Sequence, residues 1–253
     1  MHVQPPTNLN NDADRVPNTR PRLLISAGPT HEPLDAVRYI GNRSSGRMGI
    51  AIAEAAAQRG WNVEMLLGPT PRRPDNAAIN VHRYTSCADL EAGLDTHFPR
   101  CDVLIMAAAV SDYRPGQGST DVFKKRRRQS DTLTITLEKT PDLVAHCAQT
   151  KQPAQLIVAF ALEPRANMLA AAAAKLARKG TDLIVANPLE TMDADTVDAT
   201  LLASERSRLE PTRVADPGMT KPAFAQWLLQ HIEHDLRSHA GGDAQKLEHA
   251  RGE

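Results

Sequence analysis

ISAGPTHEPLDAVRYIGNRSSGRMG, residues 25–49, is the stretch that decides the fold of this chain. It continues an apolar run that begins at Leu23, turns at Gly28, and passes through a polar loop to Gly46, where a helix is expected to begin. A helix N-terminus attracts phosphate through its free N–H groups and its dipole, so this order predicts a phosphate site. The glycine spacing matches neither G-x-G-x-x-G nor the phosphate-loop lysine pattern, which predicts a nucleotide site of another kind.

Short apolar runs alternate with helical patterns along the rest of the chain. Such alternation predicts an α/β fold with a Rossmann-like, doubly wound, mostly parallel sheet covered on both faces. Ligands bind at the carboxyl ends of the strands in such sheets, and Gly28, Ala108, Phe160 and Asn187 fall at those ends. The predicted strands are 22–27, 62–67, 79–83, 102–108, 155–160 and 182–186, and the predicted helices are 46–59, 86–97, 142–149 and 163–179.

Two regions interrupt this alternation. Residues 112–140 contain a Gly-rich, basic loop and then an alternating strand at 133–137, so they are expected to extend the sheet or to protrude as an arm. Residues 199–214 predict a hairpin, which a helix at 220–236 follows.

One folded, nucleotide-binding domain is expected to span residues 21–237. Residues 1–20 are rich in Pro, Asn and Asp and carry no periodic apolar pattern, which predicts a disordered tail. Residues 238–253 predict a second disordered tail on the same grounds.

The overall composition excludes several classes of protein. The 30 Lys and Arg residues balance 30 Asp and Glu residues, and only 4% of the residues are aromatic, so no nucleic-acid partner is expected. No signal sequence and no long apolar run occurs, which predicts a cytoplasmic protein with no membrane partner. The 3 Cys and 9 His residues show no metal-ligand spacing, so a reducing compartment and no set of metal-ligating residues are predicted.

Polar residues of the first loop are candidates for a site, although each also has a simpler structural explanation. Ser44, Gly46 and Gly49 could donate hydrogen bonds to a triphosphate, or Ser44 could only cap the helix. Asn42 could stabilise charge that develops at a carbonyl group, or it could form a local Asx turn. Arg38 offers a fork-shaped donor for an anion.

Later segments supply further candidates. Asp112 could hold Mg²⁺ or a substrate hydroxyl group, or it could start a turn. Lys175 and Lys179 lie four residues apart on one predicted helix face, and the spacing alone is consistent with exposure to solvent. Phe160 ends an apolar strand, where core packing is the usual role of a phenylalanine. The run KKRRR at 124–128 could be a lid that neutralises a triphosphate, or simply a solvated basic run.

Six segments resemble the family of phosphopantothenoylcysteine synthetases, the ligases of coenzyme A biosynthesis. They follow the family's order over about residues 20–236: the first stretch, then 107–114 (AAAVSDYR), Lys124-Lys125, 139–142 (KTPD), 158–161 (VAFA) and 175–187 (KLARKGTDLIVAN). The resemblance implies that 4′-phosphopantothenate is activated by a nucleotide triphosphate to an acyl-nucleotide, which L-cysteine then attacks. It also implies Mg²⁺, and it favours CTP, with ATP as the other possibility.

The resemblance implies roles for individual residues. Asn42 would hold the acyl-nucleotide with support from Arg38, and Lys124 would assist the chemistry. The residues implied to line the substrate and nucleotide sites are Ala108, Ala109 and Asp112. The other nucleotide contacts implied are Gly28, Ser44, Gly46, Gly49, Lys125, Phe160, Lys175, Lys179 and Asn187.

The resemblance also implies a homodimer formed through 112–140. Bacterial relatives often carry a fused decarboxylase, and the short segment before the first strand leads us to expect a separate decarboxylase here.

Two alternative functions stay open, and departures from the family pattern support the first of them. Val122 stands where the family has the first lysine of the basic loop. Lys124 could substitute for that lysine, the loop could align two residues out, or the activity could be reduced or altered. This change, with Leu162 and Pro164 near the base pocket, favours a catalytically impaired paralogue that only binds a nucleotide. The other alternative is an NAD(P)-dependent Rossmann oxidoreductase, which the Gly28-Pro29-Thr30 turn disfavours because it lacks G-x-G-x-x-G.

Overall fold

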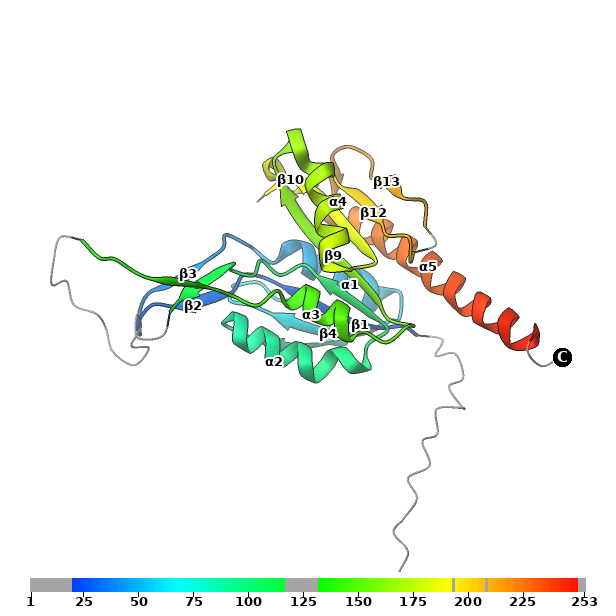
Figure 1. Ribbon diagram of the computed structural model, residues 1–253, viewed down its shortest axis with the longest axis horizontal. Helices are drawn as coiled ribbons and strands as arrows, with labels where there is room; N and C mark the ends of the chain where they lie inside the picture. Colours follow the sequence, from blue (N-terminus) through cyan, green and yellow to red (C-terminus); the bar gives the residue numbers. More distant parts are fainter. Residues whose placement is uncertain (1–19, 117–131, 193, 208, 250–253) are drawn as a thin grey trace, which may run out of the picture.

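The fold is built on one large sheet, and the computed structural model describes residues 20–116, 132–192, 194–207 and 209–249. The eight strands of this sheet are β1 (Arg22–Ala27), β4 (Asn62–Leu67), β5 (Ile79–Arg83), β6 (Val103–Met106), β9 (Leu156–Glu163), β10 (Leu183–Pro188), β12 (Thr200–Ala203) and β13 (Thr212–Val214). They lie in the order β13-β12-β10-β9-β6-β1-β4-β5, and the six strands from β10 to β5 run parallel (Figure 1). The antiparallel pair β12–β13 confirms the predicted hairpin. The predicted α/β fold with a mostly parallel sheet is therefore confirmed.

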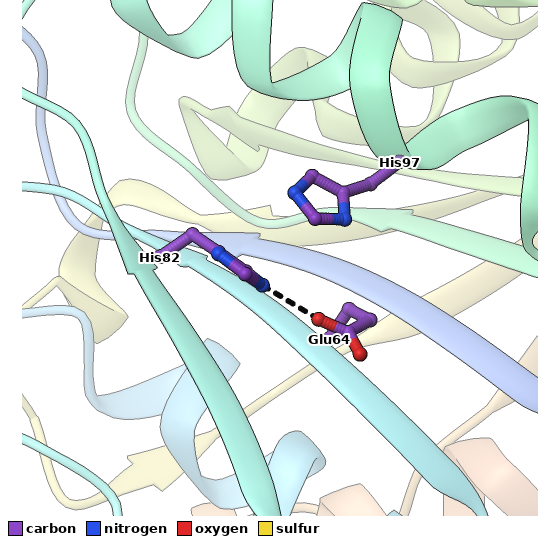
Figure 2. A group of neighbouring side chains, drawn as sticks. All are labelled: Glu64, His82 and His97. Carbon is purple, nitrogen blue, oxygen red and sulfur yellow. Dashed lines mark hydrogen bonds and ion pairs between the residues drawn. The ribbon is translucent and has the colours of Figure 1, made fainter.

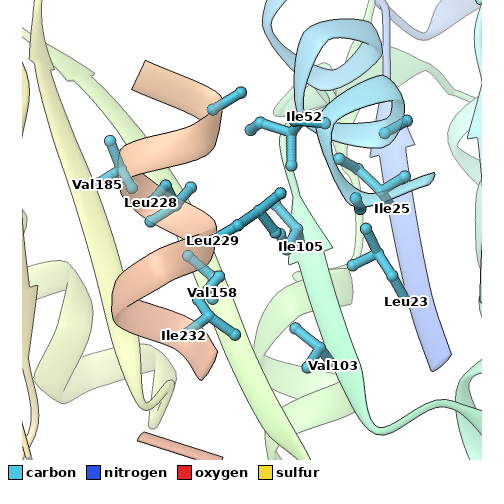
Figure 3. Packing of buried hydrophobic residues seen from close by; sticks show 14 of the residues in the cluster. Leu23, Ile25, Ile52, Val103, Ile105, Val158, Val185, Leu228, Leu229 and Ile232 are labelled. Atoms are coloured by element: carbon cyan, nitrogen blue, oxygen red, sulfur yellow. The ribbon is translucent and has the colours of Figure 1, made fainter. Parts of the chain in front are cut away.

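In the described part of the chain, five α-helices cover the two faces of the sheet: α1 (Arg47–Gln58), α2 (Cys87–His97), α3 (Leu143–Thr150), α4 (Met168–Lys179) and α5 (Lys221–His249). Successive residues of a strand point to opposite faces of the sheet, so a run of consecutive apolar residues makes both faces apolar. Leu23 and Ile25 of β1 pack in the cluster under α1 and α5, whereas Leu24 packs in the cluster under α2 and α3. Figure 3 shows Ile232 of α5 close to Val158 of β9 in the first cluster.

Outside the large sheet, the described residues form three short strand pairs: β2 (His31–Pro33) with β3 (Tyr39–Gly41), β7 (Tyr113–Pro115) with β8 (Leu137–Lys139), and β11 (Thr196–Val197) with β14 (Met219–Thr220). The β7–β8 ribbon leads away from the sheet and forms the predicted arm (Figure 1). The predicted strand at 133–137 is misplaced, because the strand structure begins at Leu137. Alternation of residue type does not reveal where the short partner strand β7 ends.

Two predicted helix boundaries are wrong. β9 continues through Glu163, which pairs with Pro188, and Pro164 is extended with φ −56° and ψ 134°, so α4 starts at Met168 rather than at 163. Pairing with β10 outweighs the local preference of Pro164 for a first helical turn. α5 runs to His249, well past the predicted end at 236, and the expected tail at 238–253 is helical up to that residue. Good helix formers such as Ala, Gln, Lys and Leu fill its last turns.

The described helices include none that is both long enough and apolar enough to cross a membrane. The tail predicted at 1–20 lies outside the described residues except for Arg20.

Candidate active site

A cavity of about 770 Å³ lies at the carboxyl edge of the parallel strands. The strand order reverses between β1 and β6, and ligands of doubly wound sheets bind at such a reversal. The walls come from the loop before α1, the loop after β6, the start of α3, the ends of β9 and β10, and one face of α4. The cavity therefore occupies the place that the strand pattern predicts for a ligand.

The N-terminus of α1 forms one wall of the cavity. The helix starts after Gly46, which has φ 72°, and no side chain caps its first turn. The Ser44 hydroxyl group accepts a hydrogen bond of 3.4 Å from the Gly46 N–H, so Ser44 is not the helix cap that the simpler explanation required. Gly46, Arg47 and Met48 line the cavity and leave the positive end of the helix dipole available to an anion.

A second glycine lets α1 approach the sheet. A Cβ atom on Gly49 would lie 2.5 Å from the Cβ atom of Ala27, the last residue of β1. No larger residue fits at this position unless α1 shifts. The absence of a side chain on Gly49 therefore places the helix N-terminus directly over the end of β1.

Asn42 connects two walls of the cavity. Its Nδ2 donates a hydrogen bond of 2.9 Å to the carbonyl oxygen of Val110, in the loop after β6. The same loop is held to the start of α3 by the Thr140 hydroxyl group, which donates to the Ser111 carbonyl oxygen at 2.6 Å. Ala108, Ala109 and Asp112 belong to this loop and line the cavity.

Cations dominate the cavity wall. Lys175 and Lys179 of α4 pair with carboxylates, Lys175 with Glu163 at 2.5 Å and Lys179 with Asp142 at 2.8 Å. Burial raises the pKa of the Asp142 carboxyl group, but the hydrogen bonds from Lys179 and from the N–H of Ala145, with the nearby positive charges, together lower it by more. Among the described residues, seven cationic residues line the cavity against the two carboxylates Asp112 and Asp142; they are Arg43, Arg47, Lys139, Lys175, Arg178, Lys179 and Lys221. The wall therefore suits a polyanion.

The far end of the cavity combines an aromatic ring with a buried amide. Phe160 of β9 is half-buried and Asn187 of β10 is 8% exposed, and both line the cavity. The Oδ1 atom of Asn187 has no hydrogen-bond partner among the described residues. A buried polar atom normally has a partner, so a ligand group that donates a hydrogen bond would complete this site.

Most of the residues predicted for the site meet in this cavity. Asn42, Ser44, Gly46, Gly49, Ala108, Ala109, Asp112, Phe160, Lys175, Lys179 and Asn187 all line it. Arg38 does not, because its exposed guanidinium group pairs with the buried Asp35 at 2.5 Å. Gly28 lies under Gly46 rather than on the wall. Lys124 and Lys125 lie outside the described residues.

The structure adds cavity residues that the sequence did not reveal. Arg178 stands three residues after Lys175 on the same helix face, and this spacing could have identified it. Thr140 occurs in the family-like segment 139–142, which received no role. Lys221, where α5 begins, donates to the Ala194 carbonyl oxygen and reaches the cavity through the tertiary fold alone.

The three cysteines take no part in the cavity. Cys87, Cys101 and Cys147 are buried as free thiols in the cluster under α2 and α3. Burial raises the pKa of Cys87 to about 11 and that of Cys101 to about 12, which disfavours the nucleophilic thiolate form. Chemistry in the cavity must therefore proceed without a cysteine side chain of the protein as the nucleophile.

The fold and cavity define a ligand-binding domain of the doubly wound α/β class. Residues 19–236 match the family described as DNA/pantothenate metabolism flavoprotein C-terminal domain, and the chain belongs to this family. This result confirms the kinship predicted from the six segments and leaves the oxidoreductase alternative without support.

Known proteins of this kind resemble the chain over most of its length. It is 41% identical over 195 residues to the coenzyme A biosynthesis bifunctional protein CoaBC of Mycobacterium tuberculosis (strain ATCC 25618 / H37Rv), over 73% of the chain and 46% of that protein. It is 44% identical over 169 residues to a cysteine/cysteine sulfinic acid decarboxylase of an unknown prokaryotic organism, over 67% of the chain and 46% of that protein. The chain thus spans about half the length of the curated relatives it matches.

A solved structure supports the same kinship. The crystal structure of the C-terminal domain of the coenzyme A biosynthesis bifunctional protein CoaBC has a TM-score of 0.71 and 33% identity to this chain. The match covers 86% of this chain and 96% of that domain, so nearly the whole domain has a counterpart here.

Proposed function

We propose that this chain is a ligase that joins 4′-phosphopantothenate to L-cysteine in coenzyme A biosynthesis. The observation that carries the proposal is the cationic cavity, which meets the uncapped N-terminus of α1 at the switch point of the sheet. Kinship to coenzyme A biosynthesis proteins supports the choice of substrates. The cavity binds the triphosphate, and the substrate carboxylate is held on the loop after β6.

The first step activates the carboxylate. A carboxylate oxygen of 4′-phosphopantothenate forms a bond to the α-phosphorus of the nucleotide, and the bond between this phosphorus and the bridging oxygen breaks to release pyrophosphate. No enzyme nucleophile is needed, so the protein contributes positioning and charge. Lys175, Arg178 and Lys179, with Lys124 and Lys125 from outside the described residues, neutralise the phosphates.

The second step forms the amide. The L-cysteine amine attacks the acyl carbonyl carbon, loses a proton, and displaces the nucleoside monophosphate as the acyl C–O bond breaks. Asn42 donates one of its two Nδ2 hydrogens to the carbonyl oxygen of Val110, and this bond fixes the orientation of the amide. The second hydrogen is left for the acyl-nucleotide, whose developing negative charge it stabilises.

The nucleotide base occupies the end of the cavity near Phe160 and Asn187. The unpartnered Oδ1 of Asn187 accepts a hydrogen bond from an exocyclic amino group, which cytosine and adenine both carry. CTP is the proposed nucleotide, with ATP as the competitor that the experiment must test.

Mg²⁺ is proposed to accompany the triphosphate. Oxygen ligands suit this ion, and the exposed Asp112 carboxylate on the cavity wall is of the required kind. When bound, Mg²⁺ would neutralise charge on the phosphate oxygens.

We also propose a cytoplasmic homodimer assembled through the arm at 112–140.

The test is pyrophosphate release from CTP, and separately from ATP, with 4′-phosphopantothenate and Mg²⁺, in the presence and absence of L-cysteine. The expected result is release that requires phosphopantothenate, with cysteine sustaining turnover and CMP accumulating. A folded protein that binds a nucleotide but releases no pyrophosphate would instead support the impaired paralogue. Carbon dioxide released from cysteine in the same mixture would favour the activity named for the decarboxylase relative.

A further inference from the structure

A group of three side chains with ligating atoms lies away from the cavity, at the β5 edge of the sheet. It consists of Glu64 from β4, His82 from β5 and His97, the last residue of α2 (Figure 2). None of the three lines the cavity. The proposed ligase chemistry therefore does not account for them.

The fold brings these residues together from separate parts of the sequence. Leu66 packs in the cluster under α2, and Glu64, two residues earlier on the same strand, points to the same face. The parallel register pairs Leu66 with His82, which places the imidazole ring beside Glu64. α2 lies over this face and ends at His97. No local spacing connects the three residues, which explains why the sequence predicted no metal ligands.

The geometry of the group is close to that of a metal site. The three ligating atoms all lie within 4.8 Å of one another. His82 Nε2 is 2.6 Å from Glu64 Oε2, and the His82 and His97 rings are 4.2 Å apart between centroids. Asn80 donates from Nδ2 to Glu64 Oε1 at 2.8 Å, which orients the carboxylate and leaves its other oxygen directed at His82.

We propose that Glu64, His82 and His97 bind one divalent transition-metal ion of the Zn²⁺ type. Two imidazoles and one carboxylate are a donor set that Zn²⁺ takes in proteins, with a water molecule in the fourth position. Ligands about 2.0–2.2 Å from one ion lie closer together than the present spread, so the side chains must rotate inward. All three are half-buried, which leaves them room to rotate and leaves the ion a path from solvent.

The hydrogen bond between Glu64 and His82 alone does not explain the group. That bond would form without His97, whose ring comes from another element and lies over His82. An ion held by all three residues would connect β4, the edge strand β5 and the end of α2. Because such an ion binds only the folded chain, it would raise the melting temperature.

The experiment uses the full chain without an affinity tag, freed of metal by a chelator and desalted. Calorimetric titration with ZnCl₂ is expected to show one equivalent bound. Titration with Co²⁺ is expected to give visible d–d bands without a thiolate charge-transfer band, which excludes the cysteines as ligands. His97→Asn and Glu64→Gln are each expected to weaken Zn²⁺ binding at least about 100-fold, beyond the effect of losing a supporting residue.

His146→Asn is the matched control. His146 is an exposed histidine that lies 4.0 Å from the Asp95 carboxylate. The variant therefore removes a histidine beside a carboxylate elsewhere on the same face of the sheet. Zn²⁺ binding is expected to stay unchanged in this variant. Asn80→Ala keeps all three ligands and is expected to weaken binding about 10–100-fold, which preserves a test if His97→Asn fails to fold. The proposal is overturned if the folded chain binds no Zn²⁺, or if His97→Asn and Asn80→Ala bind it as the unmodified chain does.

Discussion

The side-chain amide of Asn42 donates a 2.9 Å hydrogen bond to the carbonyl oxygen of Val110, and this bond joins the loop before α1 to the loop after β6. The loop with Asn42 belongs to the connection from β1 to α1, which also contains β2 and β3, and the loop with Val110 follows β6. The strand order reverses between β1 and β6. The amide of Asn42 is therefore held at the switch point, where an activated carbonyl group between the two loops would meet its remaining donor.

Asn42→Asp is expected to lower the rate of amide formation about 10²–10³-fold, the range for losing one donor to a developing negative charge. The aspartate would also repel the Val110 carbonyl oxygen. Rapid-quench measurement should show the acyl-nucleotide accumulating or being consumed slowly by cysteine. Asn62→Asp makes the same change at an exposed position outside the cavity and should leave the rate unaltered. Unchanged kinetics in Asn42→Asp would remove this residue from the mechanism.

The parallel sheet could be predicted because its strands are locally encoded. Runs such as Leu23–Ile25 and Val103–Met106 are continuously apolar, as buried parallel strands require. The boundaries that failed are fixed by partners distant in sequence. Glu163 is in a strand because Pro188 pairs with it, and the strand at Leu137 begins where Pro115 meets it.

Lys179→Met should reduce the acid sensitivity of folding. Burial raises the pKa of Asp142 in the folded state, but the combined hydrogen bonds and positive charges, of which Lys179 supplies the largest share, leave the pKa lowered. The resulting stabilisation is present above the unfolded pKa of about 3.9 and is lost as the pH falls through the folded pKa. The Asp142 side chain is 40% exposed, so solvent screening limits the effect to at most about 1 kcal/mol.

Urea unfolding at pH 7 and at pH 3 measures this difference. The unmodified chain should lose more stability than Lys179→Met between the two pH values, so the difference in stability between the two proteins should narrow at the lower one. Equal losses in both proteins would show that Lys179 does not set the ionisation of Asp142.

Lys151→Ala should be among the most destabilising substitutions outside the cavity. Lys151 Nζ lies 2.6 Å from Asp182 Oδ1, and the two side chains are 13% and 4% exposed. Asp182 also accepts a hydrogen bond of 2.8 Å from the N–H of Ile157, in the centre of the sheet. Removal of the lysine leaves a buried carboxylate unpaired, at a cost of about 3–5 kcal/mol.

The control for this pair is Arg165→Ala. Arg165 and Asp198 form an ion pair of 2.8 Å on the surface, where both side chains are substantially exposed. Exposed pairs contribute little, so this variant should unfold at an unchanged urea midpoint. A similar small effect of Lys151→Ala would mean that water enters and solvates Asp182.

The site was predictable where one segment carries several of its residues. Ser44, Gly46 and Gly49 fall within six consecutive residues at the start of α1, and Lys175 and Lys179 share a helix face by spacing alone. Arg38 is a candidate by sequence because its guanidinium group suits an anion and matches a family arginine, but the nearby buried Asp35 holds that group outside the cavity.

Asn187→Ala should separate binding from folding. The Oδ1 of Asn187 is buried and has no partner among the described residues, so the fold gains nothing from it and already bears the cost of its desolvation. Substitution should leave the free energy of unfolding unchanged or slightly higher. The nucleotide loses a hydrogen bond, so KM for CTP should rise about tenfold, in line with about 1.4 kcal/mol.

Gln155→Ala is the matched control, because Gln155 is a buried amide whose hydrogen bonds are satisfied. Its Nε2 donates to the carbonyl oxygens of Phe98 and Cys101 at 2.8 and 2.9 Å, and its Oε1 accepts from the N–H of Gln152 at 2.8 Å. Loss of this amide leaves buried partners unpaired and should cost at least about 1–3 kcal/mol, while KM for CTP stays constant. Asn187→Ala is thus expected to change KM and spare stability, whereas Gln155→Ala is expected to lower stability and spare KM. If Asn187→Ala instead lowers stability and spares KM, Asn187 serves the fold, and the nucleotide base must bind elsewhere in the cavity.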